Sequence, residues 1–270
     1  MPHERRKVNH FEIEETLVIN SMNPQIIESQ IVKMISLDNY RLLRKKAVLL
    51  HDFYLDTIDQ KLKQRRLALR LRQVGSEHWI TLKGPPKPTN WNSGIKRFEI
   101  EERFSIDNMI MIIDELNDQG VDKLSINHDQ NSKYPLETMM GIGMVVVQDR
   151  ETQRTIRNIY KLDDDSEIIQ AEMMVDSVSY HIRNQIFRHR EVEIEAKVGD
   201  GSTVLTQVVA NMVTIYGSSL RIWPYSKLIT GIVLEKLLCK GALDENLNTN
   251  NNLTPIDYDK IEKFIKHNTI

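Results

Sequence analysis

The chain contains a single cysteine, Cys239, among its 270 residues, so an intrachain disulfide and a cysteine metal cluster are both excluded. Long apolar runs are absent too: the longest, Met139–Val147, is far shorter than the roughly 20 residues that cross a bilayer. The opening residues MPHERRKVNH lack the apolar core of a signal peptide. These absences predict a cytoplasmic protein with no membrane partner.

An excess of charge of either sign is also missing. The sequence has 36 Lys and Arg residues against 38 Asp and Glu, a net charge of −2, so binding to nucleic acid through a general basic surface is not expected. The hydrophobic fraction of 40% and the charged fraction of 27% are typical of folded soluble proteins and argue against a largely disordered chain. The length suits one large domain or two small ones.

Several short motifs of well-known enzyme classes do not occur. There is no HExxH zinc motif, no Walker A loop, no Rossmann fingerprint and no serine nucleophile elbow. The eight histidines show no metal-binding spacing, so we expect them to be surface or core residues.

The sequence does contain three segments in which apolar residues alternate with carboxylates: Phe11–Glu14, Phe98–Glu101 and Val192–Glu195. Period-two alternation predicts strands that place one face on a core and turn acids to the other face. In the third segment Glu191 and Lys197 extend the charged face.

Further segments follow the same rule with other charges. In 67–72 leucines alternate with Arg70 and Arg72, in 79–83 apolar residues alternate with Lys83, and 171–176 places Glu172 and Asp176 on one face. One interpretation is an antiparallel sheet whose wet face carries surface ion pairs. The density of Arg and Glu favours a second, in which the strands form a barrel with the charged face inside. Crowded like charges would then require a ligand of opposite sign or a metal.

Helices are expected between and after these strands. The first follows Asn23-Pro24, with Asn23 as its cap; a second covers about 108–117; a third begins at Ser202 and ends at Gly217; a fourth is capped by Ser226 and ends before Gly241; and 256–267 forms a short amphipathic helix. The third helix should turn five apolar residues inward: Leu205, Val208, Val209, Met212 and Ile215.

The remaining segments define the predicted domain organisation. Residues 1–9 form an N-terminal tail, 10–240 one domain, and 241–270 an Asn-rich linker, Asn246–Asn252, followed by the short C-terminal helix. Asn127–Lys133 reads as a polar loop and Asp163–Asp165 as a solvated hairpin turn. The proline-bearing loop 84–94 is either an ordinary connection or part of the mouth of a barrel.

From about His10 to Leu238, a series of sequence elements stands in the order found in one protein family. They are the Glu12–Glu14 strand, Tyr54-Leu55-Asp56-Thr57, the Arg70–Arg72 strand, Thr81-Leu82-Lys83-Gly84, Arg97–Glu101, Arg157-Asn158-Ile159-Tyr160, the Asp176 strand with the Glu193–Glu195 strand after it, and Ser226-Lys227. In this the chain resembles the CYTH superfamily, the triphosphate tunnel metalloenzymes. The resemblance implies an α+β fold: an eight-stranded antiparallel β-barrel with helices packed outside, whose lumen binds a triphosphate with a divalent metal.

The resemblance also assigns roles to individual residues. The implied ligands of Mg²⁺ or Mn²⁺ are Glu12, Glu14, Glu99, Glu101, Asp176, Glu193 and Glu195. The implied substrate contacts are Arg70, Arg72, Lys83, Arg97, Arg157 and Lys227, of which Arg70, Arg72, Lys83 and Lys227 are also the catalytic candidates. Because Glu191 shares the face of Glu193 and Glu195, the metal-binding pair among these three stays open.

The sequence departs from the family at two positions. Thr16 stands where an ExExK motif has lysine, and Thr155 stands where a lysine commonly precedes Arg157, with Arg154 or Arg150 as substitutes. Thr16 cannot act as the amine base that such a lysine can supply. A metal-bound hydroxide, another lysine such as Lys96 or Lys197, or a tunnel that binds phosphate with little turnover would each be consistent with this change.

The implied function is a metal-dependent hydrolase of triphosphate-bearing small molecules, with inorganic tripolyphosphate first and a nucleoside triphosphate second. Two alternatives stay open: a class IV-type adenylate cyclase, and a non-catalytic module that binds polyphosphate or nucleotide. Many family members pair, so a homodimer is a further expectation, although the sequence shows no interface patch.

Overall fold

The computed structural model describes residues 11–88, 95–121, 124, 134–162, 167–199, 202–243 and 251–268. Its strands are β1 Phe11–Ile19, β2 Ser36–Leu37, β3 Tyr40–Arg44, β4 Val48–Thr57, β5 Ala68–Val74, β6 Glu77–Lys83, β7 Lys87–Pro88, β8 Ile95–Arg103, β9 Met144–Lys161, β10 Ala171–Ile182, β11 Gln185–Ala196 and β12 Leu220–Ile222. Its helices are α1 Pro24–Lys33, α2 Lys61–Gln64, α3 Ile106–Asp118, α4 Pro135–Gly141, α5 Ser202–Tyr216, the 3-10 turn η1 Gly217–Ser219, α6 Lys227–Cys239 and α7 Pro255–His267.

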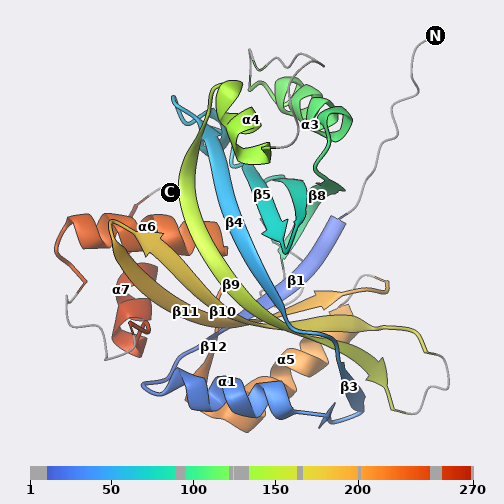
Figure 1. Cartoon of the computed structure of the whole chain (residues 1–270). Coiled ribbons are helices and arrows are strands. Elements are labelled where there is room, and N and C mark those ends of the chain that lie inside the picture. The colour runs from blue at the N-terminus through green and yellow to red at the C-terminus, as the bar shows by residue number, and fades with distance from the viewer. Residues whose placement is uncertain are drawn as a thin grey trace. The chain divides into compact units, whose positions relative to one another are not determined.

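In the described residues all the strands belong to one hydrogen-bonded sheet that closes on itself. The order is β10-β11-β1-β8-β6-β5-β4-β9, and β9 pairs back to β10 (Figure 1). Strands β3 and β2 continue from β9, while β12 pairs with β1 and β7 with β8. Closure removes the exposed edges of the eight-stranded ring. The predicted eight-stranded antiparallel barrel with helices is confirmed.

The chain divides into two compact units by its internal contacts. The first comprises residues up to 12, 53–87 and 96–147, and the second 13–52, 88–95 and 148–270. Five strands, β1, β4, β7, β8 and β9, contribute residues to both units. Each unit has a hydrophobic cluster of its own, so each is described by itself.

In the first unit, β5, β6 and β8 carry apolar and charged residues on opposite faces. Leu69 lies opposite Leu82 in the β5–β6 ladder, and both are fully buried with Met109 and Ile112 of α3. The alternating residues Arg70 and Thr81 face each other on the other side. α3 extends the predicted helix by a residue or two at each end, and the Ser105 hydroxyl caps it by accepting from the Asn108 N–H.

In the second unit, α1 and α5 cover one face of β1, β10 and β11. Leu17, Met173 and Val192 pack there against Ile31 of α1 and Leu205 of α5. Two details of the helix predictions were wrong. Asn23 precedes α1, but its side chain makes no capping hydrogen bond. Ile215, expected to face inward, is 59% exposed because it lies on the outer side of α5 near the end of that helix.

The C-terminal arm packs onto the second unit. Asn252, expected to belong to a flexible linker, is fully buried and forms a parallel bridge with Arg188, while the Leu253 N–H donates to the Arg188 carbonyl at 2.8 Å. Thr254 and Asp257 then form a capping box that begins α7. Tyr258 and Ile261 of α7 are buried, so the predicted amphipathic helix is confirmed as part of a hydrophobic core.

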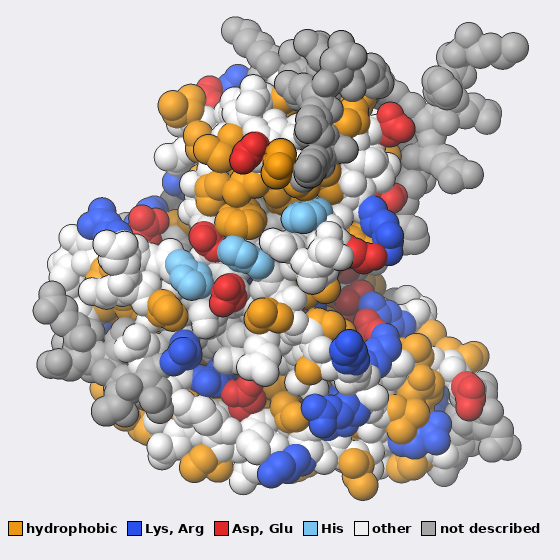
Figure 2. Space-filling model, in the orientation of Figure 1, with side chains coloured by type: hydrophobic (Ala, Val, Ile, Leu, Met, Phe, Trp, Pro, Cys, Tyr) orange, Lys and Arg blue, Asp and Glu red, His pale blue; other side chains and the backbone are white. Residues whose placement is uncertain are grey.

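Several sequence predictions lie outside the described residues. They are the tail 1–9, residues 89–94 of the loop 84–94, the loop Asn127–Lys133, the turn Asp163–Asp165, and residues 246–250 of the linker. Among the helices that are described, none is both long and apolar enough to cross a membrane. The face of the molecule shown in Figure 2 carries both basic and acidic side chains.

Candidate metal and phosphate sites

The strands of the second unit bring three acids to the face that is turned away from α1 and α5. In the β10–β11 ladder Asp176 lies directly opposite Glu191, and Met174 opposite Glu193. The intervening residues Val175 and Val192 pack in the hydrophobic cluster. Because neighbours along a strand point to opposite faces, the burial of these valines turns the acids to the other side.

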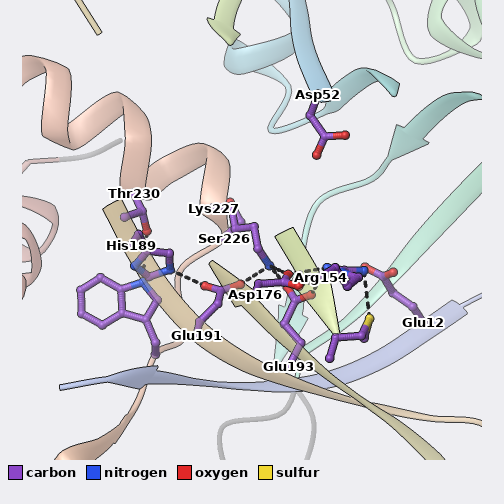
Figure 3. Close-up of polar contacts among 12 residues, drawn as sticks. Glu12, Asp52, Arg154, Asp176, His189, Glu191, Glu193, Ser226, Lys227 and Thr230 are labelled. Atoms are coloured by element: carbon purple, nitrogen blue, oxygen red, sulfur yellow. Dashed lines mark hydrogen bonds and ion pairs between the residues drawn. The ribbon is translucent and has the colours of Figure 1, made fainter. Parts of the chain in front are cut away.

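Asp176, Glu191 and Glu193 form what we call the acid triad: one carboxylate oxygen from each lies within 4.8 Å of the other two. The side chains are 0%, 1% and 14% exposed. Figure 3 shows all three near the ammonium of Lys227, which begins α6 after the Ser226 cap. The Lys227 Nζ lies 3.1 Å from Asp176 Oδ2 and 2.5 Å from Glu193 Oε1, and it also contacts Glu191 Oε1.

Arg154 of β9 is the second cation at the acid triad. Its Nε and Nη2 donate to the two Asp176 oxygens at 2.8 and 2.6 Å, a bidentate arrangement, and Nη2 also donates to Glu193 at 2.8 Å. Burial raises the pKa of Asp176, but Arg154 and Lys227 outweigh it and hold this pKa below its usual value. Burial lowers the pKa of Lys227, but Glu191, Glu193 and Asp176 reverse the shift and raise it. Asp176 is therefore ionised and Lys227 is protonated at neutral pH.

The donor set of the acid triad fits a divalent cation. Carboxylate oxygens are the ligands that Mg²⁺ and Mn²⁺ prefer, and three of them converge here. Three acids and two cations also leave one formal negative charge in excess, so a cation is favoured by charge. Lys227 and Arg154 hold the triad together in the structure described here.

The other predicted acids of this unit lie further along the strands. Glu14 lies opposite Glu195 in the β1–β11 ladder. Glu195 contacts Lys197 at 2.7 Å, and Lys197 also contacts Glu172 at 3.1 Å. Among the three glutamates that the sequence left undecided, the structure gathers Glu191 and Glu193 with Asp176 and pairs Glu195 with a lysine.

The structure does not bring Arg157 to the acid triad. Arg157 lies opposite Met173 in the β9–β10 ladder, on the face that packs against α1 and α5, and opposite Arg44 in the β3–β9 ladder. It is 4% exposed, and burial together with Arg44 lowers its pKa. Arg154, three residues earlier and on the other face, takes the position beside the acids.

The first unit contains the remaining predicted residues, and most of them form ion pairs there. Arg70 Nη2 donates to Glu101 at 2.7 Å and to the Thr81 hydroxyl at 3.1 Å. Lys83 Nζ lies 2.9 Å from Glu12 and 3.1 Å from Glu99, and Arg97 also pairs with Glu12. We call Arg70, Arg72, Lys83 and Arg97 the basic cluster.

The acids beside the basic cluster titrate in opposite directions. Burial raises the pKa of Glu12, yet Lys83 and Arg97 hold it well below its usual value. Burial and a hydrogen bond with Glu12 raise the pKa of Glu99 to about 8. Burial raises the pKa of Glu101, but Arg70 and Arg72 outweigh it and the net shift is downward. At neutral pH Glu99 is therefore a carboxylic acid that shares its proton with ionised Glu12.

Sequence reasoning named Arg150 only as a substitute and missed its partner Asp52. The side chains are 2% and 0% exposed, and Arg150 Nη2 lies 3.1 Å from Asp52 Oδ2. The second missed feature is His189, which was expected to be a surface or core residue. It is fully buried and lies 2.6 Å from Glu191 of the acid triad. No spacing in the sequence could reveal either pair, because both depend on the fold.

Comparison with known proteins agrees with the fold. No curated protein matches the chain at a significant level. A proposed adenylyl cyclase from Hippeastrum that reveals a dominant triphosphatase activity is 16% identical, with a TM-score of 0.51 over 87% of this chain and 98% of that one. Proposed adenylate cyclases from Bacillus halodurans and Vibrio parahaemolyticus are each 15% identical over 80% of this chain and 94% and 95% of theirs, with TM-scores of 0.47 and 0.43. The CYTH domain model matches residues 26–218, and the chain therefore belongs to the CYTH domain family.

Proposed function

We propose that this protein is a divalent-metal-dependent hydrolase of triphosphate-bearing small molecules, with inorganic tripolyphosphate as the first candidate substrate and a nucleoside triphosphate as the second. The observation that carries the proposal is the acid triad, whose oxygens lie within 4.8 Å of one another on a polar strand face of a CYTH barrel. A cytoplasmic location and a homodimer remain predictions of the sequence.

The acid triad is the proposed metal site. Asp176, Glu191 and Glu193 would hold Mg²⁺ or Mn²⁺ through carboxylate oxygens. When bound, such a metal neutralises negative charge on the phosphoryl oxygens and orients the groups that react. The protein supplies the orientation of the acids through Arg154 and Lys227, which donate to them from two different elements.

The basic cluster is the proposed phosphate site. A triphosphate carries about four negative charges near neutral pH, so it takes several cations to hold it. Arg70 and Arg97 can present forked donors to phosphate oxygens, while Lys83 acts as a point charge. Glu12 and Glu101 pair with these cations and hold their side chains in place.

Hydrolysis needs a group that accepts a proton from the attacking water, and the candidates for this role bear on a second possible function. Lys227 has a raised pKa, and so does Lys197, whose burial is outweighed by Glu195 and Glu172; neither is a neutral amine near pH 7. Thr16, opposite Glu193 in the β1–β11 ladder, cannot replace the missing lysine. These observations favour a non-catalytic module that binds polyphosphate or nucleotide as the alternative. The class IV-type adenylate cyclase has no comparable observation in its favour.

The decisive experiment is phosphate release from tripolyphosphate, ATP and thiamine triphosphate, with Mg²⁺ or Mn²⁺ titrated and EDTA as control. Release that depends on metal would support the hydrolase, and cyclic AMP with pyrophosphate from ATP would instead support a cyclase. Tight tripolyphosphate binding in calorimetry without release would support the binding module. Glu193→Gln should need at least about tenfold more Mn²⁺ for phosphate release. Glu195→Gln is the matched control, because Glu195 pairs with Lys197 outside the acid triad; equal effects of the two variants would contradict the assignment.

A further inference from the structure

A buried histidine stands directly behind one member of the acid triad. His189 is on β11, two residues before Glu191 and on the same strand face, and it is fully buried. Its Nε2 lies 2.6 Å from Glu191 Oε2, and its Nδ1 lies 3.0 Å from the Tyr258 hydroxyl. The other Glu191 oxygen, Oε1, contacts Lys227 (Figure 3). Glu191 Oε2 therefore contacts the histidine, while Oε1 contacts the lysine at the acid triad.

The groups around His189 determine which nitrogen of the neutral imidazole donates and which accepts. The backbone N–H of Arg190 points to the Tyr258 oxygen at 3.4 Å, which leaves the tyrosine O–H to donate to His189 Nδ1. His189 Nε2–H then donates to Glu191. The partner of one ring nitrogen thus sets what the other nitrogen can do. A hydrogen bond of this kind fixes the rotamer of a carboxylate that binds metal.

Tyr258 belongs to α7 of the C-terminal arm and contacts residues outside that arm. Its ring makes edge contacts with His189 at 5.6 Å and with Trp223 at 5.4 Å, centroid to centroid. The Arg221 guanidinium lies over the ring at 5.9 Å. The capping box of Thr254 begins α7 just before Tyr258. All of α7 lies beyond residue 218, where the match to the CYTH domain model ends.

We propose that His189 and Tyr258 are positioning residues for a divalent metal at the acid triad, so that the C-terminal arm is part of the site. Tyr258 fixes the imidazole, and the imidazole fixes Glu191 so that Oε1 faces Asp176 and Glu193. Without the imidazole, Glu191 would lose the contact that fixes Oε2, and its carboxylate could turn Oε1 away from Asp176 and Glu193. The proposal rests on the metal site of the proposed function and not on the hydrolysis that this site would support.

The test is the affinity of the full-length protein for Mn²⁺ alone, measured by the electron paramagnetic resonance signal of free Mn²⁺. Tyr258→Phe keeps the ring and removes the hydroxyl, and we expect about fivefold weaker binding. His189→Leu should weaken binding roughly tenfold or more. His189→Gln should recover part of this loss, because its amide N–H can still donate to Glu191. Tyr225→Phe is the matched control: it removes a hydroxyl from a ring that also contacts Trp223 but not His189.

The outcomes separate this proposal from the hydrolase. Weaker Mn²⁺ binding in Tyr258→Phe, with Tyr225→Phe equal to the wild type, supports the positioning role even if no phosphate is released from any substrate. Equal Mn²⁺ affinity in Tyr258→Phe and the wild type overturns it, even if the wild type hydrolyses triphosphate. A wild type that binds no Mn²⁺ overturns it as well. Should His189→Leu fail to fold, Tyr258→Phe still decides, since that variant retains the packing of the ring.

Discussion

Replacing Lys227 by methionine would remove the cation that contacts all three members of the acid triad. The Lys227 side chain is 7% exposed, and Asp176 and Glu191 are 0% and 1% exposed, so water cannot replace the lost ammonium. Methionine keeps the length and the apolar stem of lysine. The variant therefore tests the charge at this position and leaves the packing nearly unchanged.

The size of the effect follows from burial. Removing one partner of a buried ion pair typically costs about 3–5 kcal/mol, because the remaining charge is left without compensation. Arg154 still pairs with Asp176 and Glu193 in the variant, so we expect the lower end of this range, about 3 kcal/mol. Lys45→Met is the control: Lys45 pairs with Glu172 at 2.6 Å but is 45% exposed, so its loss should cost less than about 1 kcal/mol.

The assay is equilibrium urea unfolding in EDTA and again with Mn²⁺. Because the metal would replace the missing charge, Lys227→Met should bind Mn²⁺, and Mn²⁺ at about 100 times its Kd should then stabilise the folded variant by roughly 2.7 kcal/mol. The loss in EDTA should also grow as pH rises. The uncompensated acids would take up protons in the folded state, and stability falls with rising pH where the folded state binds more protons. A variant as stable as the wild type in EDTA, or one that Mn²⁺ does not rescue, would refute the reasoning.

Two further predictions concern the first unit. The pKa of Glu99 is raised from 4.5 to about 8, so its contribution to stability is complete below pH 4.5 and is lost as pH rises through 8. The loss is at most about 1.4 kcal/mol per pH unit, and Glu99→Gln should abolish it in urea unfolding in EDTA. Equal pH slopes of stability in Glu99→Gln and the wild type would contradict the prediction. Arg72→Ala should weaken tripolyphosphate binding in calorimetry about tenfold and leave the unfolding midpoint unchanged. Arg103→Ala is the control: Arg103 is 67% exposed, and its loss should change neither the binding nor the midpoint. Equal binding by the two variants would remove Arg72 from the site.

Alternation of apolar and charged residues predicted the strands β1, β5, β6, β8 and β11, and the resemblance to the CYTH superfamily implied the eight-stranded barrel. Such alternation determines the buried face of each strand without knowledge of its neighbours. The pattern therefore placed Glu191, Glu193 and Glu195 on one face. Which of them meet at one point depends on the β10–β11 register, which places Asp176 opposite Glu191. No local pattern contains this information.

Strand β9 shows where sequence reasoning failed to locate a side chain. Its segment 149–161, DRETQRTIRNIYK, has charged or polar residues in both alternating phases, so its two faces cannot be told apart by composition. A shift of one residue moves a side chain to the other face of the sheet. The resemblance pointed to Arg157, while the ladder with β10 turns Arg154 to the acids and Arg157 to the helices. Contacts between distant segments, such as His189 with Tyr258, were equally beyond reach.

Under the proposed function, the charges around the acid triad would link metal binding to triphosphate binding. In the structure, Arg154 and Lys227 are bound to the same carboxylates that a divalent cation would need. A metal that binds alone must compete with both cations for these oxygens. A triphosphate offers them phosphate oxygens in exchange, with about four negative charges of its own. Each ligand thus relieves the cost of binding the other, and by reciprocity metal should tighten triphosphate binding by the same factor by which triphosphate tightens metal binding.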